Sequence, residues 1–374
     1  MALSANKRSA KKIDPGHATE RQSAKAAFLE ETAWAGAQIT SLAGDASTRS
    51  YDRLTLNGRS ALLMNAPPGE ETAPCPRDAS PSERQRLGYN ALARLAGPNL
   101  AAFTTIAETL RSAGLSAPEV YAVDPHTGFA LIEDLGDALF ARVIPDGQDE
   151  DTLYASAVDA LIALNAAQAP APETPDYQML EYDRTAMEAE VALLTDWYIE
   201  YKTGSAPDDG VKSDFQAAFA PALDQLSTPH TIVLRDFHAE NLIWLSDRKG
   251  QARVGVIDFQ DGLYGHAAYD LVSLLEDARR DVSPVVADAM VKHYLDHGPD
   301  TSDPEQFLTD YAVLGAQRNA KILGIFARLI TRDKKDRYQQ FLPRVEAHFR
   351  RNLSHPALAD AASFMRSHFP DLIA

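Results

Sequence analysis

The stretch 231–258 constrains the fold most, because it places two short apolar runs around a polar turn. The runs Leu242–Leu245 and Arg253–Ile257 are long enough for strands, and the polar residues between them predict an antiparallel hairpin. In such a hairpin the chain doubles back on itself. Asn241, just before the first run, would then lie beside Asp258, just after the second.

This hairpin would bring three oxygen-bearing side chains to one place. Asn241 and Asp258 offer an amide oxygen and a carboxylate, which are the hard ligands that Mg²⁺ or Mn²⁺ prefers. Asp236 precedes Asn241 by five residues, on the loop that enters the hairpin, where it could accept the proton of an attacking hydroxyl. Each Asp alone would also suit a turn or a helix cap. The ordered set is the D-x-x-x-x-N … D arrangement of kinase catalytic loops, and it predicts phosphoryl transfer.

The charge and composition of the chain limit its partners. A formal net charge of −17 argues against wide contact with nucleic acid or anionic lipid, but it does not exclude a nucleotide in a local pocket. Cys75 is the only cysteine, so the sequence predicts neither an intramolecular disulfide nor a thiolate-rich metal site. No apolar run approaches the roughly 18 residues that a membrane span needs. We therefore expect a cytoplasmic protein that binds a nucleotide and a small-molecule acceptor.

The remaining pattern predicts an α+β protein with two lobes. Residues 1–25 are rich in Lys, Arg, Ser and Ala and predict a disordered basic tail. Residues 26–135 open with a predicted helix over Ala26–Thr40. They also contain two apolar runs joined by Asn57-Gly58, a strong hairpin signal, and they predict a small, β-rich, nucleotide-binding N-terminal lobe. Residues 136–374 are mostly helical in pattern and predict a larger C-terminal lobe for catalysis and acceptor binding.

Several further segments match one known family in order along the chain. They are Gly44–Tyr51 (GDASTRSY), Leu63–Pro68 (LMNAPP), Phe129–Gly136 (FALIEDLG), Leu234–Asn241 (LRDFHAEN), Val256–Asp261 (VIDFQD), Gly265–Arg279 (GHAAYDLVSLLEDAR) and Gln317–Leu329 (QRNAKILGIFARL). With these segments the chain resembles the aminoglycoside phosphotransferase/choline kinase superfamily. Within it, the chain is most similar to the bacterial anomeric sugar kinases, the N-acetylmuramate/N-acetylglucosamine 1-kinases. The resemblance implies a protein-kinase-like bilobal fold, ATP as phosphoryl donor, and the anomeric hydroxyl of an amino sugar as acceptor, in cell-wall sugar recycling.

Position by position, the resemblance also implies roles for single residues. Asp236 would be the catalytic base, and Asn241 and Asp258 would hold Mg²⁺. Asp270 would brace the catalytic loop through backbone hydrogen bonds. A loop over the phosphates and a hinge against the adenine ring would bind the nucleotide. The residues expected to bind it are Gly44, Ser47, Thr48, Arg49, Arg53, Glu133 and Leu135.

The sequence departs from the general kinase pattern at one position. A strand lysine usually pairs with nucleotide phosphates, yet the matching position here is Met64 or its neighbour, and no lysine occurs between Lys25 and Lys202. The cation must therefore be an arginine. The nearby arginines are Arg49, Arg53 and Arg59. Arg49 is the first choice because a guanidinium forks onto phosphate oxygens, although all three would also suit a solvated surface.

Two groups of side chains are candidates for the acceptor pocket. Trp197 and Tyr201 recur at helical spacing, and aromatic rings stack on sugars, although a buried stripe has the same spacing. Arg318, Lys321 and Arg328 would share one face of a C-terminal helix. Such a face could meet an anionic acceptor, for example one with a lactyl carboxylate. A solvated basic face explains the same pattern.

Two other functions fit the same motifs. One is a related phosphotransferase that acts on an aminoglycoside, choline or another amine, for which we would expect a pocket lined by Asp and Glu. The other is a nucleotide-binding protein with little catalysis, which the missing strand lysine suggests. The intact set of Asp236, Asn241 and Asp258 argues against the second alternative.

Overall fold

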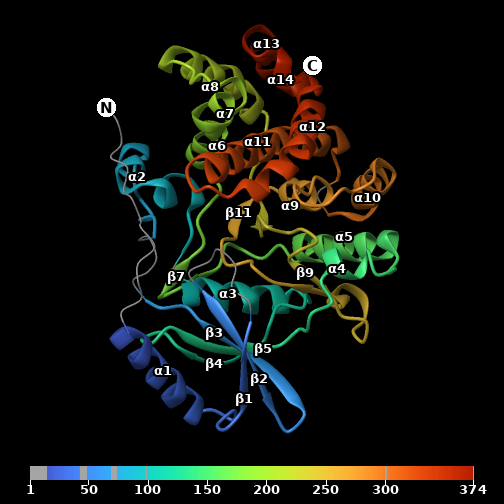
Figure 1. Ribbon diagram of the computed structural model, residues 1–374. Coiled ribbons are helices and arrows are strands. Elements are labelled where there is room, and N and C mark those ends of the chain that lie inside the picture. Colours follow the sequence, from blue (N-terminus) through green and yellow to red (C-terminus); the bar gives the residue numbers. More distant parts are fainter. Residues whose placement is uncertain (1–14, 43–48, 69–73, 98, 300, 374) are drawn as a thin grey trace. The chain divides into compact units, whose positions relative to one another are not determined.

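The computed structural model describes residues 15–42, 49–68, 74–97, 99–299 and 301–373. The chain divides into two compact units (Figure 1). The sheet unit comprises residues 1–71 and 119–134, and the helical unit comprises residues 72–118 and 135–374. Over the described ranges, none of the helices combines the length and the apolar character that crossing a membrane requires.

This division differs from the expected one in the segment 72–118, which groups with the helical unit. Packing explains the difference. Phe103, in this segment, stacks on Phe259 with ring centroids 5.0 Å apart, and Ser116 forms a β-bridge with Gly255. Both partners lie near Asp258, more than 130 residues further along the chain, so the order of patterns along the sequence did not predict the grouping.

The sheet unit contains a five-stranded antiparallel sheet with the strand order β1-β2-β3-β5-β4. The strands are β1 (Gln38–Ser41), β2 (Ser50–Leu56), β3 (Arg59–Asn65), β4 (Val120–Asp124) and β5 (Phe129–Glu133). The predicted hairpin is confirmed as β2–β3. Its turn residues Asn57 and Gly58 have φ of 51° and 75°, which is the left-handed backbone that a two-residue turn of this kind requires.

Helix α1 (Pro15–Glu30) packs its apolar residues on one face of this sheet. Phe28 and Leu29 join a buried cluster with Leu54, Leu63 and Phe129. The helix therefore begins earlier than the predicted Ala26, and the expectation of a disordered tail over the whole of 1–25 is wrong. Residues 1–14 lie outside the described part of the chain.

Two basic residues explain why composition misplaced the start of this helix. The guanidinium of Arg21 lies 3.8 Å from the centroid of the Phe129 ring, and Lys25 Nζ lies 2.5 Å from Asp52 Oδ2. Residues 21, 25, 28 and 29 share one helix face, so the Arg and Lys stems lie along the sheet while their charges find partners.

The helical unit is built around α11 (Pro304–Thr331), most of which is buried. The other α-helices are α2 (Pro81–Leu87), α3 (Asn99–Ser112), α4 (Phe140–Val143), α5 (Glu150–Ala166), α6 (Arg184–Val191), α7 (Ile199–Thr203), α8 (Asp209–Leu223), α9 (Ala268–Leu275), α10 (Pro284–His297), α12 (Leu342–Leu353), α13 (Ala359–His368) and α14 (Pro370–Ile373). Short π and 3₁₀ segments are η1 (Asn90–Arg94), η2 (Leu194–Tyr198), η3 (Gly250–Arg253), η4 (Asp336–Phe341) and η5 (Pro356–Leu358). Gly324 of α11 is required by packing, because a Cβ there would collide with the Leu193 carbonyl.

Three pairs of short antiparallel strands complete the helical unit. They are β6 (Glu173–Thr174) with β7 (Tyr177–Gln178), β8 (Thr231–Val233) with β11 (Leu263–Gly265), and β9 (Leu242–Trp244) with β10 (Val254–Val256). The pairs β8–β11 and β9–β10 enclose the segment that carries Asp236, Asn241 and Asp258. The small sheet unit and the larger, mainly helical unit confirm the predicted α+β class.

Candidate active site

The hairpin predicted after Asn241 is present. In the β9–β10 pair, Leu242 lies opposite Val256, and the N–H of Ile257 donates to the Asn241 carbonyl at 3.1 Å. Asn241 therefore lies across from the residue that precedes Asp258. This confirms that the two apolar runs fold back on each other and bring these two side chains to neighbouring positions.

The side chain of Asn241 is fixed by the loop. Its Nδ2 donates to the Asp236 carbonyl at 2.9 Å, so the loop holds the nitrogen end of the amide and the oxygen end points elsewhere. Asp258 follows with a φ of 60°, a conformation that non-glycine residues adopt at a cost and that clusters at active sites. Its Oδ1 accepts a hydrogen bond from Gln260 Nε2 at 2.9 Å. The two residues offer one amide oxygen and one carboxylate, a donor set that suits Mg²⁺ when phosphates supply further ligands.

Asp270 holds the backbone that enters the catalytic loop. Its carboxylate accepts the N–H of Leu234 at 2.6 Å and the N–H of Arg235 at 2.9 Å. Burial raises the pKa of Asp270 to about 7, and the two backbone hydrogen bonds oppose that rise only in part. The two residues before Asp236 are therefore each tied to helix α9 by one hydrogen bond to this carboxylate.

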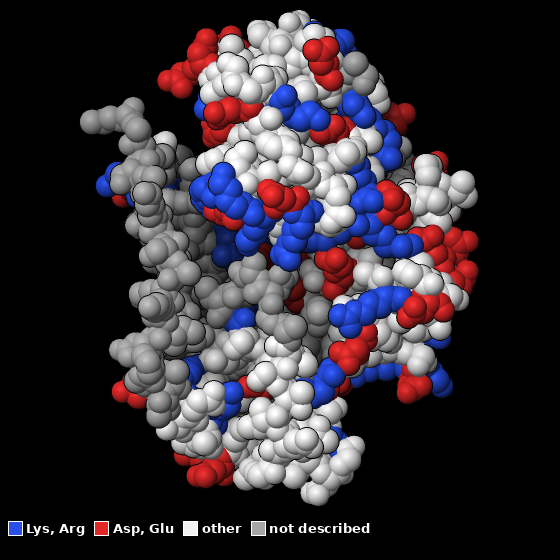
Figure 2. All heavy atoms as spheres, in the orientation of Figure 1, with Lys and Arg blue, Asp and Glu red and all other residues white. Residues whose placement is uncertain are grey.

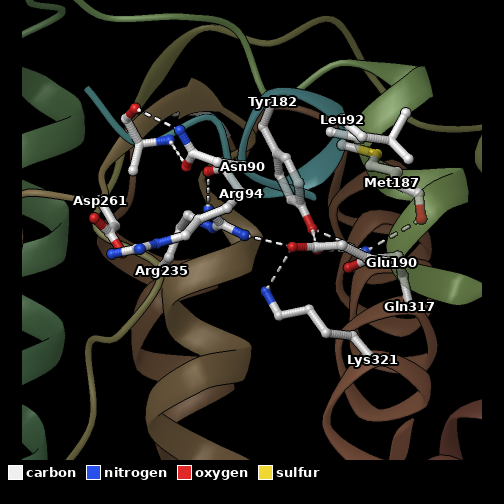
Figure 3. A network of polar contacts seen from close by, with 12 residues as sticks. Asn90, Leu92, Arg94, Tyr182, Met187, Glu190, Arg235, Asp261, Gln317 and Lys321 are labelled. Atoms are coloured by element: carbon white, nitrogen blue, oxygen red, sulfur yellow. Dashed lines mark hydrogen bonds and ion pairs between the residues drawn. The ribbon is translucent and has the colours of Figure 1, made fainter. Parts of the chain in front are cut away.

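Arg235 anchors the same loop through its side chain. Its φ is 68°, so the chain turns sharply just before Asp236. The buried guanidinium lies 2.5 Å from Glu190 Oε1 and donates to the Arg94 carbonyl at 2.6 Å. It also lies over the Tyr182 ring, 5.1 Å from its centroid. Figure 3 shows the side chains of Arg235 and Tyr182 converging on Glu190.

Glu190 is the centre of this network and was not predicted from the sequence. Its Oε1 also lies 3.2 Å from Lys321 Nζ, and its Oε2 accepts hydrogen bonds from the Tyr182 hydroxyl and, at 3.1 Å, from Gln317 Nε2. Burial alone would raise the pKa of Glu190, but Lys321 and Arg235 outweigh it and hold that pKa below its usual value. No local motif marks Glu190, because its partners come from distant parts of the chain.

Arg318 and Lys321 lie on the side of α11 that meets the catalytic loop. Arg318 is only 4% exposed and donates to Ser273 Oγ at 2.8 Å, and Ser273 in turn donates to the Arg235 carbonyl at 3.1 Å. Lys321 donates to the Tyr269 hydroxyl at 3.1 Å. A solvated basic face is therefore wrong for these two residues. The burial of Arg318 favours support of the loop over contact with an acceptor.

These cations act on Asp236, whose side chain is accessible to solvent. The surrounding protein raises the pKa of Asp236, but nearby positive groups lower it by a larger amount. The pKa of Asp236 therefore lies below its usual value. The groups are His238, Lys321, Arg235 and Arg318. Burial lowers the pKa of His238 itself, and its Nε2 accepts from Arg279 Nη1 at 3.0 Å. At neutral pH the lysine and arginines therefore keep Asp236 ionised.

In the sheet unit, one face of the sheet carries the expected nucleotide-binding side chains. Tyr51 lies opposite Met64, and its hydroxyl is 3.4 Å from the Met64 sulfur, so both point to the face opposite α1. Arg53 is two residues from Tyr51 within β2 and belongs to the same face, whereas Arg49 directly precedes the strand. Arg59 belongs to the other face, where it lies 5.4 Å from the Trp34 ring centroid.

Arg53 is tied within the sheet unit, and Arg49 is buried. Arg53 Nε lies 2.8 Å from Asp134 Oδ2, and the Asp134 side chain is only 4% exposed. Arg53 therefore ties β2 to the end of β5, where the hinge was predicted. Arg49 is buried, at 8% exposure. The predicted loop residues Gly44, Ser47 and Thr48 lie outside the described residues.

The remaining candidates have clear places in the fold. The N–H of Glu133, at the end of β5, donates to the Glu119 carbonyl at 2.8 Å, so this amide already serves the sheet. Leu135 is the buried first residue of the second part of the helical unit. Trp197 in η2 and Tyr201 in α7 are both half-buried. Their roles stay predictions.

Comparison with known proteins agrees with this geometry. Residues 38–307 match the family model described as the phosphotransferase enzyme family. The chain belongs to this family. It is 45% identical to the N-acetylmuramate/N-acetylglucosamine kinase of Caulobacter vibrioides, across 94% of this chain and 98% of that protein.

Solved structures of phosphotransferases share the fold. The microcompartment-associated aminopropanol kinase has a TM-score of 0.56 at 12% identity, with 96% of this chain and 99% of that chain covered. The ADP-bound aminoglycoside phosphotransferase APH(2'')-Ib has a TM-score of 0.51 at 13% identity, with coverage of 88% and 96%. These similarities confirm the protein-kinase-like fold expected from the sequence.

Proposed function

We propose that this protein transfers the γ-phosphoryl group of ATP to the anomeric hydroxyl of N-acetylmuramate or N-acetylglucosamine. The observation that carries the proposal is the β9–β10 hairpin, which sets Asn241 beside Asp258 and fixes Asn241 to the loop of Asp236. The relative from Caulobacter vibrioides, similar over nearly the whole chain, supports the choice of sugar. ATP as donor would place the reaction in the cytoplasm.

Asp236 would act as the base in this reaction. Its lowered pKa keeps the carboxylate ionised at neutral pH, so it can accept the proton of the sugar hydroxyl. The hydroxyl oxygen forms a bond to the γ-phosphorus, the bond from that phosphorus to the bridging oxygen breaks, and ADP leaves. The ties from Asp270 and Glu190 to Arg235 hold the loop in place before substrate arrives.

The donor set of the hairpin fits a magnesium ion. Asn241 and Asp258 would hold Mg²⁺, which when bound neutralises charge on the phosphate oxygens. In the sheet unit, Arg49 would supply the remaining positive charge, because a guanidinium forks onto phosphate oxygens, whereas Arg59 lies against the Trp34 ring. Met64, which lies opposite Tyr51, or its neighbour Asn65 would stand where other kinases place a lysine.

The charges around Asp236 favour a sugar over an amine acceptor. Lys321, Arg235 and Arg318 all lower the pKa of Asp236, so the potential at this carboxylate is more positive than a lone Asp would create. An ammonium group beside Asp236 would be repelled by these cations, whereas a neutral or anionic sugar would not be repelled. The aminoglycoside and choline alternatives would instead need acidic groups there.

The test is ATP turnover with N-acetylmuramate, N-acetylglucosamine and a panel of amines, with NMR of the product to locate the phosphate. We expect a sugar 1-phosphate from the wild type and a loss of about 10²- to 10⁴-fold in kcat for Asp236→Asn, which is the usual contribution of a positioned base. Asp288→Asn, an exposed residue of α10, is the matched control. Turnover of amines alone, or undiminished activity of Asp236→Asn, would overturn the proposal.

A further inference from the structure

Arg328, near the end of α11, is a partly buried cation. Its guanidinium lies over the Tyr89 ring, 5.3 Å from the centroid. Its Nε is shielded from solvent and makes no hydrogen bond, and it forms no salt bridge with any residue that the structure describes. Burial lowers the pKa of Arg328, and the attraction of Tyr89 and Asp333 does not offset it. A guanidinium placed this way gains stability when an anion binds to it.

Tyr89 connects Arg328 with the network behind Asp236. Burial raises the pKa of the Tyr89 hydroxyl, with Glu190, Arg235, Arg328 and Tyr269 as its charged or ionisable neighbours. Glu190 and Tyr269 also contact Lys321. Lys321 and Tyr89 therefore share these two neighbours, and Tyr89 lies against Arg328.

The spacing along α11 gives the distance between Lys321 and Arg328. Lys321 and Arg328 are seven residues apart, so they lie on one face of the helix about two turns, or roughly 10 Å, from each other. An acceptor whose reacting hydroxyl is near Asp236 would reach Arg328 with a substituent on the far side of its ring. Lys321 is held by Glu190, whereas Arg328 has no such carboxylate among the residues described here.

The surface beyond Arg328 is also basic. Arg332, Lys334 and Lys335 follow it at the end of α11, and Figure 2 shows basic side chains gathered where α11 ends and η4 begins. The chain as a whole carries a net charge of −17. A local positive region on such a chain favours the approach of an anionic ligand to this place over the rest of its surface.

We propose that Arg328, which lies over the Tyr89 ring, binds a carboxylate carried by the acceptor sugar and so sets the preference between anionic and neutral acceptors. The inference rests on the proposed function. The lactyl carboxylate is the group that N-acetylmuramate has and N-acetylglucosamine lacks. A guanidinium can donate two parallel hydrogen bonds to such a group.

The experiment measures kcat/KM for N-acetylmuramate and for N-acetylglucosamine in the wild type, Arg328→Gln and Arg328→Lys. A charged hydrogen bond contributes about 1.5–3 kcal/mol, which is roughly 10- to 100-fold. We therefore expect the kcat/KM for N-acetylmuramate, divided by that for N-acetylglucosamine, to fall about 10- to 100-fold in Arg328→Gln. The fall should come from a higher KM for N-acetylmuramate. Arg328→Lys keeps the charge without the fork and should give an intermediate ratio. The methyl ester of N-acetylmuramate should behave like a neutral acceptor in all three proteins.

Arg337→Gln is a matched control, because Arg337 also lies 5.3 Å from a tyrosine ring centroid, that of Tyr338. We expect it to leave the ratio unchanged. If Arg328→Gln changes the ratio by less than twofold, or lowers both kcat/KM values equally, the inference is wrong while the sugar kinase proposal stands. If the wild type phosphorylates neither sugar, the proposed function fails and the inference fails with it. Should Arg328→Gln not fold, the Arg328→Lys ratio decides.

Discussion

The buried carboxylate of Glu190 offers the most demanding test of how the catalytic loop is held. We consider Glu190→Gln, which preserves shape and removes one negative charge. In the wild type, Oε1 faces Arg235 and Lys321, and Oε2 faces the Tyr182 hydroxyl and Gln317 Nε2. All of these partners donate hydrogen bonds. The glutamine side chain has only one acceptor oxygen. Its NH₂ group must therefore face one of the two pairs of donors.

The magnitude follows from the burial of these groups. Glu190 is 0% exposed, and the side chains of Arg235 and Lys321 are 7% and 13% exposed. Removing one partner of a buried ion pair costs about 3–5 kcal/mol, because a charge is left without compensation. For a unit of this size we expect Tm to fall by roughly 6–20 °C. Because Arg235 precedes Asp236, the displaced loop should also lower kcat, by up to about 100-fold.

The assay is urea and thermal unfolding together with ATP turnover, compared with Glu188→Gln. Glu188 lies on the same helix, α6, and pairs with Arg184 at 2.6 Å, but both side chains are well exposed. That pair should contribute less than about 1 kcal/mol. A double variant, Glu190→Gln with Lys321→Met, removes one of the uncompensated cations, so its cost should be smaller than the sum of the single costs.

Two outcomes would refute this reasoning. A loss for Glu190→Gln no larger than that for Glu188→Gln would mean that the network does not hold the loop. Single and double costs that add within about 0.5 kcal/mol would mean that Glu190 and Lys321 are energetically independent.

Two further predictions concern the nucleotide and the response to acid. Arg49→Ala should raise KM for ATP about tenfold or more, because it removes charged hydrogen bonds to phosphate. Arg59→Ala, at a residue that lies against Trp34, should leave KM for ATP unchanged. The reverse result in steady-state kinetics would exchange the roles of the two arginines. Burial lowers the pKa of His266 to about 4, although Asp310 opposes the shift. Since the unfolded state then takes up a proton that the folded state does not, the free energy of unfolding should fall between pH 6.5 and 4, by up to about 3 kcal/mol. Urea titrations of the wild type and His266→Gln at pH 7 and pH 4.5 measure this, and an equal fall in both proteins would contradict it.

Local sequence determined the features that depend on short-range geometry. The turn Asn57-Gly58 fixed the β2–β3 hairpin because its two residues adopt positive φ without strain or at low cost. The apolar runs on either side of residues 246–250 fixed the β9–β10 hairpin, and with it the neighbouring positions of Asn241 and Asp258. Pairing between adjacent strands requires only the turn and the register, and both are written in neighbouring residues.

Tertiary structure decided the features that depend on burial. Lys25 appeared to belong to a solvated tail and instead pairs with Asp52 against the sheet. Arg318 and Lys321 fitted a solvated face as well as a pocket, and only the packing of α11 against the loop shows Arg318 buried and Lys321 mostly shielded. Glu190 had no signal at all. A charge is stable in the interior only when partners from distant segments surround it, and those partners are defined by packing rather than by spacing along the chain.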